Sequence, residues 1–474
     1  MKQSCDVAII GAGTAGLSAL REVRKQTDDF VIINDGPYGT TCARVGCMPS
    51  KALIESANTF HRRKYLAELG IHGADQLAID VPAVLRRVRK LRDEFVAGIR
   101  KLTDEIGSRS IPGKARFVEP DVLQVGDLRL QAKTIIIATG SHPIVPPDWA
   151  ALGPRILTSD NLFEQPTLPA RVAVLGLGSL GIEIAQALAR LGVQITAFGA
   201  GPSVSGASDI QINERVLALL RQEFSLHLGH RAAVSAEGDR VRVLAGDQQV
   251  TVDAVFAALG RRPNLDGLGL QHLGVSLDAQ GMPPFNRQSM QVGDLPVYIA
   301  GDVNDDLAVM HEANDEGHIS GYNARLDDSE TPNCFQRRTP LAIVFSDPNI
   351  AMVGQRFADL DEKQIVTGTV DFSNQGRARI AAENRGMLRL YANREDGRLL
   401  GAEMCAPRGE HLAHLLALAI GNRQTVHELL GMPFYHPAFE EGLRTALRDA
   451  SRRLEGFSGS DLAGCDPVGA NALD

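Results

Sequence analysis

One short glycine pattern occurs twice in this chain, and its two copies begin 165 residues apart, at positions 11 and 176. Each copy follows a β-branched run and precedes an amphipathic helical pattern, over residues 17–26 and 182–192. The glycines are Gly11, Gly13 and Gly16 in the first copy and Gly176, Gly178 and Gly181 in the second. Such loops bring backbone N–H groups and a helix N-terminus to a pyrophosphate. One copy alone would be weak evidence, but two in this context predict two dinucleotide sites.

A pair of cysteines, Cys42 and Cys47, follows the first glycine loop in the stretch GTTCARVGCMPSK. On a regular helix, residues five apart are separated by about 7.5 Å along the axis and point in different directions. A disulfide joins Cα atoms that lie about 4.4–6.8 Å apart. We therefore expect the chain to bend between them at Gly46, where bending costs little. A bent, strained disulfide is easily reduced, so the pair predicts a redox-active dithiol; the alternative is two buried thiols that never meet.

Length, charge and cysteine usage narrow the class of protein. A chain of 474 residues is too long for one core and implies about three domains. The net charge of −8, without a sustained basic block, argues against nucleic acid as a partner. Six scattered cysteines with one close pair do not form a secreted disulfide framework. No apolar stretch is long enough to span a membrane, and a first strand that begins by residue 6 leaves no room for a presequence, so we expect a cytoplasmic protein.

The remaining pattern suggests further elements. Apolar residues spaced three and four apart predict a long helix over residues 84–106. Strand-like runs over 115–137 lead to Thr139-Gly140, and another strand leads to Gly301-Asp302. From about residue 339 onward, strand and helix patterns are mixed. The last nineteen residues are rich in Gly, Ser and Asp, and we expect them to be flexible.

Together these motifs resemble the class I flavin-dependent pyridine nucleotide–disulfide oxidoreductases, and among them most closely the dihydrolipoamide dehydrogenases. The matching stretches follow the family's order: residues 11–16, 39–51, 134–140, 176–183, 260–264, 300–302, and His436-Pro437 with Glu441. The resemblance implies an α/β fold with two Rossmann-like dinucleotide-binding domains, for FAD and NAD(P), and a C-terminal α+β dimerisation domain. The implied divisions are 1–148 (first part of the FAD domain, with the dithiol), 149–272 (NAD(P) domain), 273–338 (completing the FAD domain), 339–455 (interface domain) and 456–474 (tail).

The resemblance also implies catalytic roles. Cys47 would face the flavin, Cys42 would exchange with the substrate, and His436 would be the general base, oriented by Glu441. A thiol attacks only as the thiolate, so a base that titrates near neutral pH is needed, and imidazole is such a base. In relatives this histidine comes from the other subunit, which implies a homodimer.

Other residues are matched to the cofactor sites. Lys51 and Glu183 match a pair that lies beside the flavin in relatives; an ordinary surface ion pair is the alternative. The FAD site implied by the resemblance contains Gly11, Gly13, Gly16, Asn34, Asp35, Thr41, Lys51, Thr139, Gly140, Gly301, Asp302 and His311. The NAD(P) site contains Gly176, Gly178, Gly181, Glu183, Gly199, Gly260 and Arg261.

The chain departs from the family pattern in three places. Asn34 stands where a glutamate usually holds the adenosine ribose of FAD, although its amide oxygen can still accept a hydrogen bond from that ribose. Gly199 stands where an NAD site usually carries an acid, and no arginine occurs between 199 and 209 to bind a 2′-phosphate. We therefore expect a modest preference for NAD(H), with NADP(H) also possible. The tail carries a single Cys465, whereas mercuric reductases carry a C-terminal cysteine pair.

The favoured function is dihydrolipoamide oxidation by NAD+, through FAD and a Cys42–Cys47 disulfide, on a lipoyl domain or a small molecule and possibly within a 2-oxo acid dehydrogenase complex. Alternatives are an NAD(P)H-dependent reductase of another disulfide such as glutathione, for which the basic cluster 61–64 could bind carboxylates, and a transhydrogenase or quinone reductase. A non-catalytic subunit of a multienzyme complex is a more remote alternative, because the catalytic set is intact. His411 and His414 lack a third ligand, so we expect no metal site.

Overall fold

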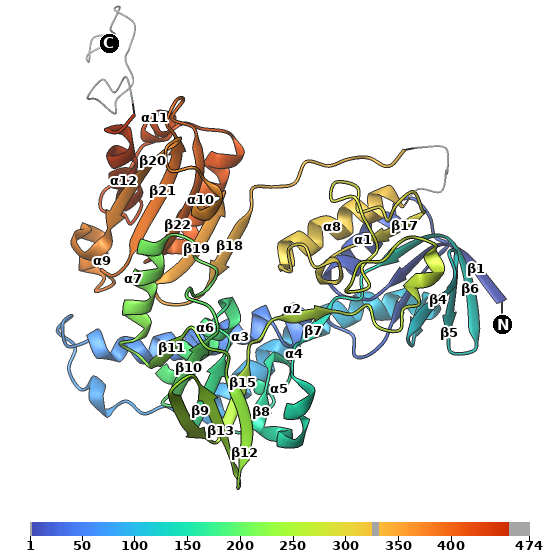
Figure 1. Cartoon of the computed structure of the whole chain (residues 1–474), viewed down its shortest axis with the longest axis horizontal. Coiled ribbons are helices and arrows are strands. Elements are labelled where there is room, and N and C mark those ends of the chain that lie inside the picture. Colours follow the sequence, from blue (N-terminus) through green and yellow to red (C-terminus); the bar gives the residue numbers. More distant parts are fainter. Residues whose placement is uncertain (1, 325–330, 455–474) are drawn as a thin grey trace, which may run out of the picture.

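The computed structural model describes residues 2–324 and 331–454 and has three lobes, each built around its own sheet (Figure 1). The lobe around β1 lies at one end of the molecule, and the lobes around β9 and β19 lie together at the other. The predicted flexible tail 456–474 and its Cys465 lie outside the described residues.

The first sheet has seven strands. Six follow the order β3-β2-β1-β6-β5-β4, and β17 pairs with the last three residues of β6. Strands β1, β2, β3, β6 and β17 run parallel, whereas β4 and β5 form an antiparallel extension. Strand β17, more than 150 residues after β6, therefore belongs to the N-terminal sheet. The strands are β1 (Lys2–Ile10), β2 (Phe30–Asn34), β3 (Ser110–Pro112), β4 (Ala115–Glu119), β5 (Val122–Val125), β6 (Leu128–Ile137) and β17 (Val297–Ile299).

The second sheet is parallel, in the order β11-β10-β9-β15-β8, and a small antiparallel sheet β12-β13-β14 is attached to it. The strands are β8 (Ile156–Leu157), β9 (Arg171–Leu175), β10 (Gln194–Gly199), β11 (Ser225–Leu228), β12 (Ala233–Glu237), β13 (Arg240–Ala245), β14 (Gln248–Val252) and β15 (Ala254–Ala257). A two-stranded ribbon, β7 (Ser141–Pro143) against β16 (Arg261–Pro263), lies where the chain passes between this lobe and the first.

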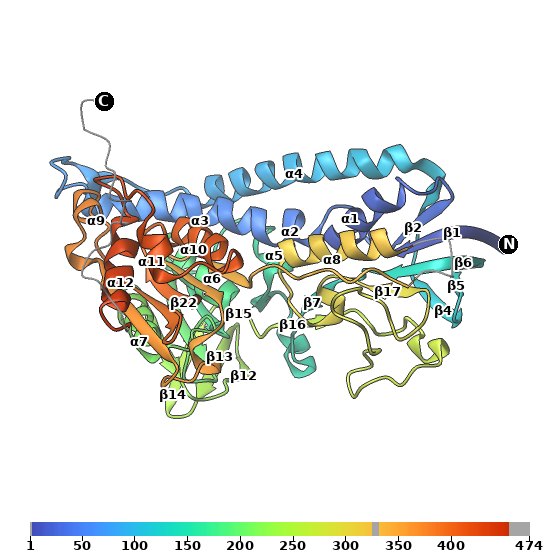
Figure 2. The same cartoon turned by 90° about the horizontal axis from the view of Figure 1, so that it is seen from above.

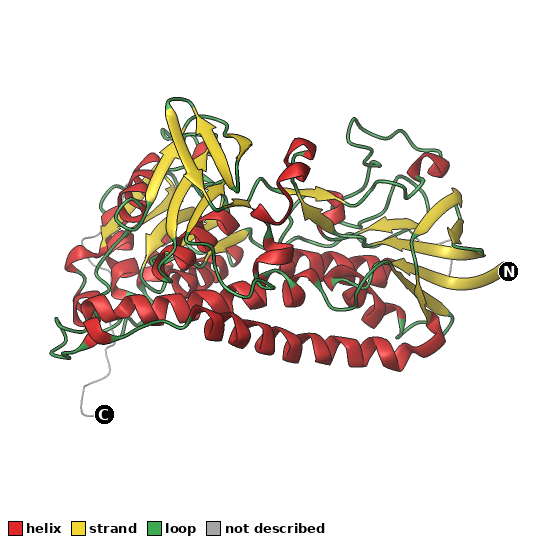
Figure 3. Cartoon of the chain, turned by 90° about the horizontal axis from the view of Figure 1, so that it is seen from below, coloured by secondary structure: helices red, strands yellow, loops and turns green. Residues whose placement is uncertain are grey.

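Helices cover both parallel sheets and gather along one long side of the molecule (Figures 2 and 3). Helix α1 packs on α8, and α3 packs on both α4 and α6, so that α3 joins the lobe around β1 to the lobe around β9. These helices are α1 (Thr14–Val23), α2 (Thr41–Arg44), α3 (Cys47–His61), α4 (Val81–Ile106), α5 (Ser159–Leu162), α6 (Ser179–Arg190), α7 (Ile210–Leu220) and α8 (Met310–Asn323).

The C-terminal lobe is an antiparallel sheet in the order β18-β19-β22-β21-β20, with helices packed on it. It is an α+β unit with its own core of alternating strand residues and helix faces. Its elements are β18 (Leu341–Val344), β19 (Asn349–Gly354), β20 (Ile365–Asp371), α9 (Gly376–Ile380), β21 (Met387–Asn393), β22 (Leu399–Ala406), α10 (Gly409–Gly421), α11 (Val426–Leu430) and α12 (Glu441–Ser451).

Strand β1 begins at Lys2, which agrees with the expected start by residue 6, and its N-terminal half pairs with β6. Three helices begin earlier than expected. Helices α1 and α6 each begin three residues before their expected starts, directly after the second glycine of each loop. The long helix predicted over 84–106 is present as α4 and starts at Val81, with Asp80 capping its N-terminus. Within the described ranges, no helix has both the length and the apolar content needed to cross a bilayer.

Candidate redox site

The first glycine loop is built so that only glycine fits at two of its positions. Gly11 has φ +110°, and a Cβ there would lie 2.2 Å from the Ala138 carbonyl oxygen. A Cβ on Gly16 would lie 1.9 Å from the Gly11 carbonyl oxygen. The second loop repeats this arrangement. A Cβ on Gly176 would lie 2.1 Å from the Ala258 carbonyl oxygen, and a Cβ on Gly181 would lie 1.9 Å from the Gly176 carbonyl oxygen. Both helices therefore pack tightly on the strand end that precedes them, as in dinucleotide-binding units.

The middle glycine of each loop, in contrast, faces open space. Gly13 and Gly178 are the N-caps of α1 and α6, and a Cβ on either would meet no atom within 4 Å. Neither helix has a side-chain cap at this end. Two helix N-termini thus present uncapped N–H groups to an open space, the arrangement that binds the pyrophosphate of a dinucleotide.

Asn34 ends β2 beside the first loop and uses its side chain to hold that loop. Its Oδ1 accepts a hydrogen bond from the Ala12 N–H at 3.1 Å, and its Nδ2 donates to the Gly36 carbonyl at 2.9 Å. The neighbouring Asp35 is exposed. Asn34 therefore supports the backbone of the glycine loop, a role that its position in the sequence did not indicate.

The two cysteines lie on different helices that meet at Gly46. Cys42 is in α2, and Cys47 is the first residue of α3. Gly46 has φ −115°, so it does not need the left-handed region; a Cβ there would lie 3.0 Å from the Thr41 carbonyl and 3.2 Å from the Cα of Cys42. The expected bend is present, and glycine is required because the two backbones approach closely.

The two thiols differ in acidity. The hydrogen bond between them, together with burial, raises the pKa of Cys42. The same hydrogen bond and the positive charge of Lys51 outweigh burial at Cys47 and lower the pKa of its thiol to about 7. Of the two sulfurs, the one predicted to face the flavin is therefore the more acidic.

Lys51, Glu183 and Phe345 bring three parts of the chain together next to this sulfur. Lys51 lies one turn after Cys47 on α3, and its Nζ donates to Glu183 Oε2 at 2.7 Å. Glu183, on α6, is only 4 % exposed, and its Oε1 accepts the Phe345 N–H at 2.9 Å. The Phe345 ring lies 4.7 Å from Lys51 Nζ. The burial of Glu183 distinguishes this contact from an ordinary surface ion pair. Phe345, from the C-terminal lobe, was not predicted from the sequence.

The turn that contains Asp302 lies at the end of β17, and its backbone is hydrogen-bonded to a buried carboxylate. Glu316, on α8, is fully buried and accepts from the Gly301 N–H and from Asn304 Nδ2, both at 2.7 Å. Arg337 donates to the other oxygen of Glu316 at 2.9 Å. The predicted FAD residue His311 is about half exposed near the start of α8, and Thr41 is exposed at the start of α2.

The β7–β16 ribbon follows Thr139 and Gly140 on one strand and Gly260 on the other, and Arg261 is the first residue of β16. Thr139 Oγ1 donates to the Asn264 carbonyl at 2.9 Å, and Asn264 Nδ2 donates back to the Thr139 carbonyl at 2.8 Å. These predicted FAD and NAD(P) residues therefore share one cross-linked segment.

His436 and Glu441 lie together in the C-terminal lobe. His436 Nδ1 is 3.0 Å from Glu441 Oε1, and the Ala438 N–H donates to Glu441 Oε2 at 3.1 Å. The hydrogen bond with His436 lowers the pKa of the Glu441 carboxyl. Because Nδ1 donates to this carboxylate, the free Nε2 is the basic atom. The imidazole is 79 % exposed and lies on a different lobe from Cys42.

Gly199 ends β10 in a crowded position. A Cβ there would lie 2.7 Å from Leu228 Cδ2 and 3.2 Å from Leu177 Cδ1. These two apolar side chains fill the place next to the strand end where an acidic side chain would have to pass.

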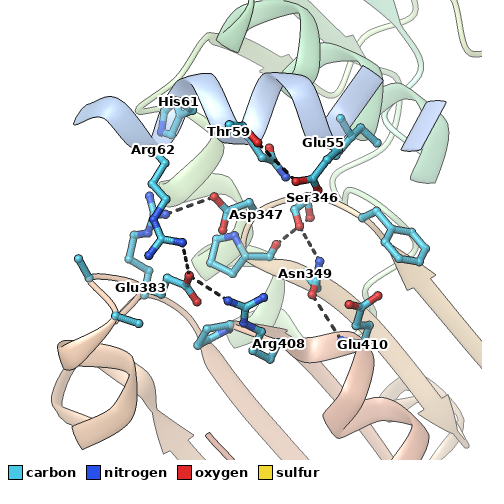
Figure 4. Close-up of a pocket in the computed structure, with 18 of the residues that line it drawn as sticks. Glu55, Thr59, His61, Arg62, Ser346, Asp347, Asn349, Glu383, Arg408 and Glu410 are labelled. Atoms are coloured by element: carbon cyan, nitrogen blue, oxygen red, sulfur yellow. Dashed lines mark hydrogen bonds and ion pairs between the residues drawn. The ribbon is translucent and has the colours of Figure 1, made fainter. Parts of the chain in front are cut away.

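A cavity of about 420 Å³ lies between α3 and the C-terminal lobe (Figure 4). Lys51 lines it, but neither cysteine does. Arg62, from the predicted basic cluster 61–64, points into it and lies 3.6 Å from Glu383, which Arg408 also contacts. His61 is buried, and Arg63 stacks on Phe60, so the cluster does not form one basic patch. Because neither cysteine lines this cavity, it is a poor candidate for the redox site.

His411 and His414 are exposed on α10, and across the described ranges no three potential ligands come close enough to hold a metal ion. The site combines a pair of cysteines with two dinucleotide-type glycine loops. This combination defines the class of dithiol–disulfide oxidoreductases that use nucleotide cofactors.

Comparison with known proteins identifies the family. A model for the pyridine nucleotide–disulphide oxidoreductases matches residues 5–317, and one for their dimerisation domain matches residues 341–447. The chain belongs to this family of FAD-dependent enzymes that use pyridine nucleotides. It is 31% identical to a mercuric reductase of Acidithiobacillus ferrooxidans (96% of this chain, 84% of that protein). It is 27% identical to dihydrolipoyl dehydrogenase 3 of Haloarcula marismortui (95% and 97%). The Cu(II) complex of the Escherichia coli HOCl-induced flavoprotein disulfide reductase RclA shares its fold, with 22% identity, a TM-score of 0.82 and coverage of 94% and 99%.

Proposed function

We propose that the protein is a dihydrolipoamide dehydrogenase, which oxidises dihydrolipoamide with NAD+ through a Cys42–Cys47 disulfide and FAD. The observation that carries the proposal is the placement of the two cysteines at the junction of α2 and α3, with Lys51 one turn after Cys47 and paired at 2.7 Å with the buried Glu183 of α6. Relatives named dihydrolipoyl dehydrogenase match nearly the whole chain, which supports this substrate.

The residues present fit FAD at the first loop and a nicotinamide nucleotide at the second. The open space at Gly13 and Gly178 leaves room for a pyrophosphate at each helix N-terminus. Asp302 would hold the ribityl chain of FAD from the end of β17. When bound, FAD carries two electrons between the dithiol and the nicotinamide.

The thiol chemistry follows from the two cysteines. A substrate thiolate attacks Cys42 Sγ of the oxidised pair, forming a mixed disulfide and releasing Cys47 as a thiolate. The second substrate thiolate then attacks the substrate sulfur of that mixed disulfide and releases Cys42. The substrate dithiol becomes a disulfide while the protein disulfide becomes a dithiol, so two electrons have moved. Lys51 holds the resulting negative charge at Cys47.

His436 would accept the substrate thiol proton at Nε2 and return it to the leaving Cys42 sulfur. Glu441 holds Nδ1 and stabilises the imidazolium that forms. Because His436 is exposed and lies in another lobe from Cys42, we propose that each site is completed by His436 of a second copy in a homodimer. The match of residues 341–447 to the family's dimerisation domain supports this assembly.

Steady-state turnover tests the substrate. Dihydrolipoamide with NAD+ should give a kcat/KM at least tenfold above that of the reverse-direction substrates oxidised glutathione and cystine with NADH or NADPH. The 31% identity to a mercuric reductase justifies one further arm, NADPH oxidation driven by Hg(II). Faster turnover with Hg(II) or glutathione than with either form of lipoamide would reject the proposal.

A further inference from the structure

A chain of hydrogen bonds connects the ribbon between the two nucleotide-binding lobes with the Asp302 turn. Arg261 Nε donates to Ser141 Oγ at 2.7 Å, and Ser141 Oγ donates to Asp302 Oδ2 at 2.7 Å. A second Arg261 nitrogen donates to the Ser141 carbonyl, also at 2.7 Å. Ser141 begins β7, Arg261 begins β16, and Asp302 follows β17.

The direction of each bond in this chain is fixed. A guanidinium only donates, so the Ser141 hydroxyl must accept from Arg261 and give its one proton to Asp302. Arg261 Nε is 3.8 Å from Asp302 Oδ2, so the two form an ion pair, but the hydrogen bond to that oxygen comes from the Ser141 hydroxyl.

The arrangement leaves one oxygen of Asp302 available. Oδ2 is occupied by Ser141, whereas Oδ1 accepts no side-chain hydrogen bond from residues 2–324 or 331–454. Glu316 fixes the preceding Gly301 N–H. The carboxylate is therefore held on one side by Ser141 and on the backbone side by Glu316, and its remaining oxygen can accept a ligand hydroxyl.

We propose that Ser141 is a positioning residue for FAD, which orients Asp302 Oδ1 toward the ribityl hydroxyls, and that Arg261 sets the direction of the Ser141 hydroxyl. This rests on the proposed role of Asp302 in binding FAD. Arg261 follows Gly260 in the segment that leads back from the second nucleotide-binding sheet. In this role Arg261 supports the FAD site, whereas the resemblance placed it in the NAD(P) site.

The FAD dissociation constant of the purified holoprotein, measured from the fluorescence of released FAD, tests the proposal. Ser141→Ala should weaken FAD binding about tenfold or more, as expected when a hydrogen bond to a charged group is lost. Ser141→Thr, which keeps the hydroxyl, should stay within about threefold of wild type. Ser451→Ala is the control, because it removes a hydrogen-bonded serine hydroxyl that contacts His427 in the C-terminal lobe, and it should leave FAD affinity unchanged.

Arg261→Met tests the same chain of bonds from its other end and decides the matter if Ser141→Ala does not fold. It should also weaken FAD binding, and the double variant should be no weaker than the worse single variant, because both changes break one chain. Additive losses, or an unchanged affinity in Ser141→Ala, would overturn the proposal. Asp302→Ala distinguishes the proposed role of Asp302 from that of Ser141. If Asp302→Ala leaves FAD affinity unchanged, Asp302 does not bind FAD as proposed. If Asp302→Ala weakens FAD binding and Ser141→Ala does not, only the role of Ser141 is wrong.

Discussion

Lys51 Nζ lies 2.7 Å from Oε2 of the buried Glu183, and this contact joins the helix that begins at Cys47 to the helix of the second nucleotide loop. Cys47 and the second glycine loop are far apart in sequence, yet the helices that follow them, α3 and α6, meet at this pair. The charge of Lys51 is therefore shared between a carboxylate on one side and the Cys47 sulfur on the other. Lys51 therefore helps to lower the pKa of the Cys47 thiol.

The Cys47 thiolate should titrate near neutral pH. In the reduced, FAD-loaded protein we expect a long-wavelength thiolate-to-flavin absorbance that is present above about pH 7 and fades as the pH falls through that value. Cys47→Ser should keep FAD and lose the band, whereas Cys42→Ser should keep it. Lys51→Met should raise the midpoint, because it removes a cation that favours the thiolate. A band that persists in Cys47→Ser would show that the other sulfur faces the flavin.

His436→Gln should reduce disulfide turnover about 10²–10⁴-fold, the usual contribution of a general acid–base group. Reduction of artificial acceptors should largely survive, because it bypasses the dithiol. Parallel rate measurements with lipoamide and an artificial acceptor provide the check. An equal loss of both activities would mean that His436 supports folding or assembly instead.

Sequence patterns predicted the glycine loops, the long helix and the bend between the cysteines, because each depends on local spacing or on one residue type. The contact of Glu183 with the Phe345 N–H could not be predicted in this way. It joins residues 162 positions apart through a backbone group, and any residue except proline could supply that group. Likewise, Ser141 follows the 134–140 stretch but is not part of it, and only the pairing of β7 with β16 brings it between Arg261 and Asp302.

The buried His61 should make the protein sensitive to acid. Burial, and next the charge of Arg190, lower the pKa of His61 to about 4, whereas an unfolded histidine titrates near 6.5. Between about pH 6.5 and 4, His61 binds a proton in the unfolded state but stays neutral in the folded state. The free energy of unfolding should therefore fall between about pH 6.5 and 4, by up to about 3 kcal/mol. Urea unfolding of His61→Gln should show a smaller fall than wild type, and the exposed His72→Gln should match wild type. Equal slopes in all three proteins would contradict the assignment.

The chain should be a dimer at nanomolar concentration, with most contacts from residues beyond 339. Tyr435 is 84% exposed and Leu418 is 62% exposed in the C-terminal lobe, and an interface would bury such side chains. Leu418→Glu should shift sedimentation toward the monomer and reduce disulfide turnover together. Ile210→Glu, at a similarly exposed position on α7, is the matched control and should do neither. An active wild-type monomer would exclude a site shared between subunits.

Nicotinamide preference should be small. Gly199 provides neither an acidic group to attract the ribose diol of NAD nor the repulsion that excludes a 2′-phosphate, so both contributions to specificity are weakened. The ratio of kcat/KM values for NADH and NADPH should stay within about thirtyfold, leaning toward NADH, which corresponds to a difference below about 2 kcal/mol. Gly199→Glu should increase the preference for NADH, but a Cβ at this position would lie 2.7 Å from Leu228, so the substitution needs room. We therefore expect the full effect only when Gly199→Glu is combined with Leu228→Ala, with Leu228→Ala alone as the control. A wild-type ratio above about a thousandfold in either direction would show that other residues read the 2′ position.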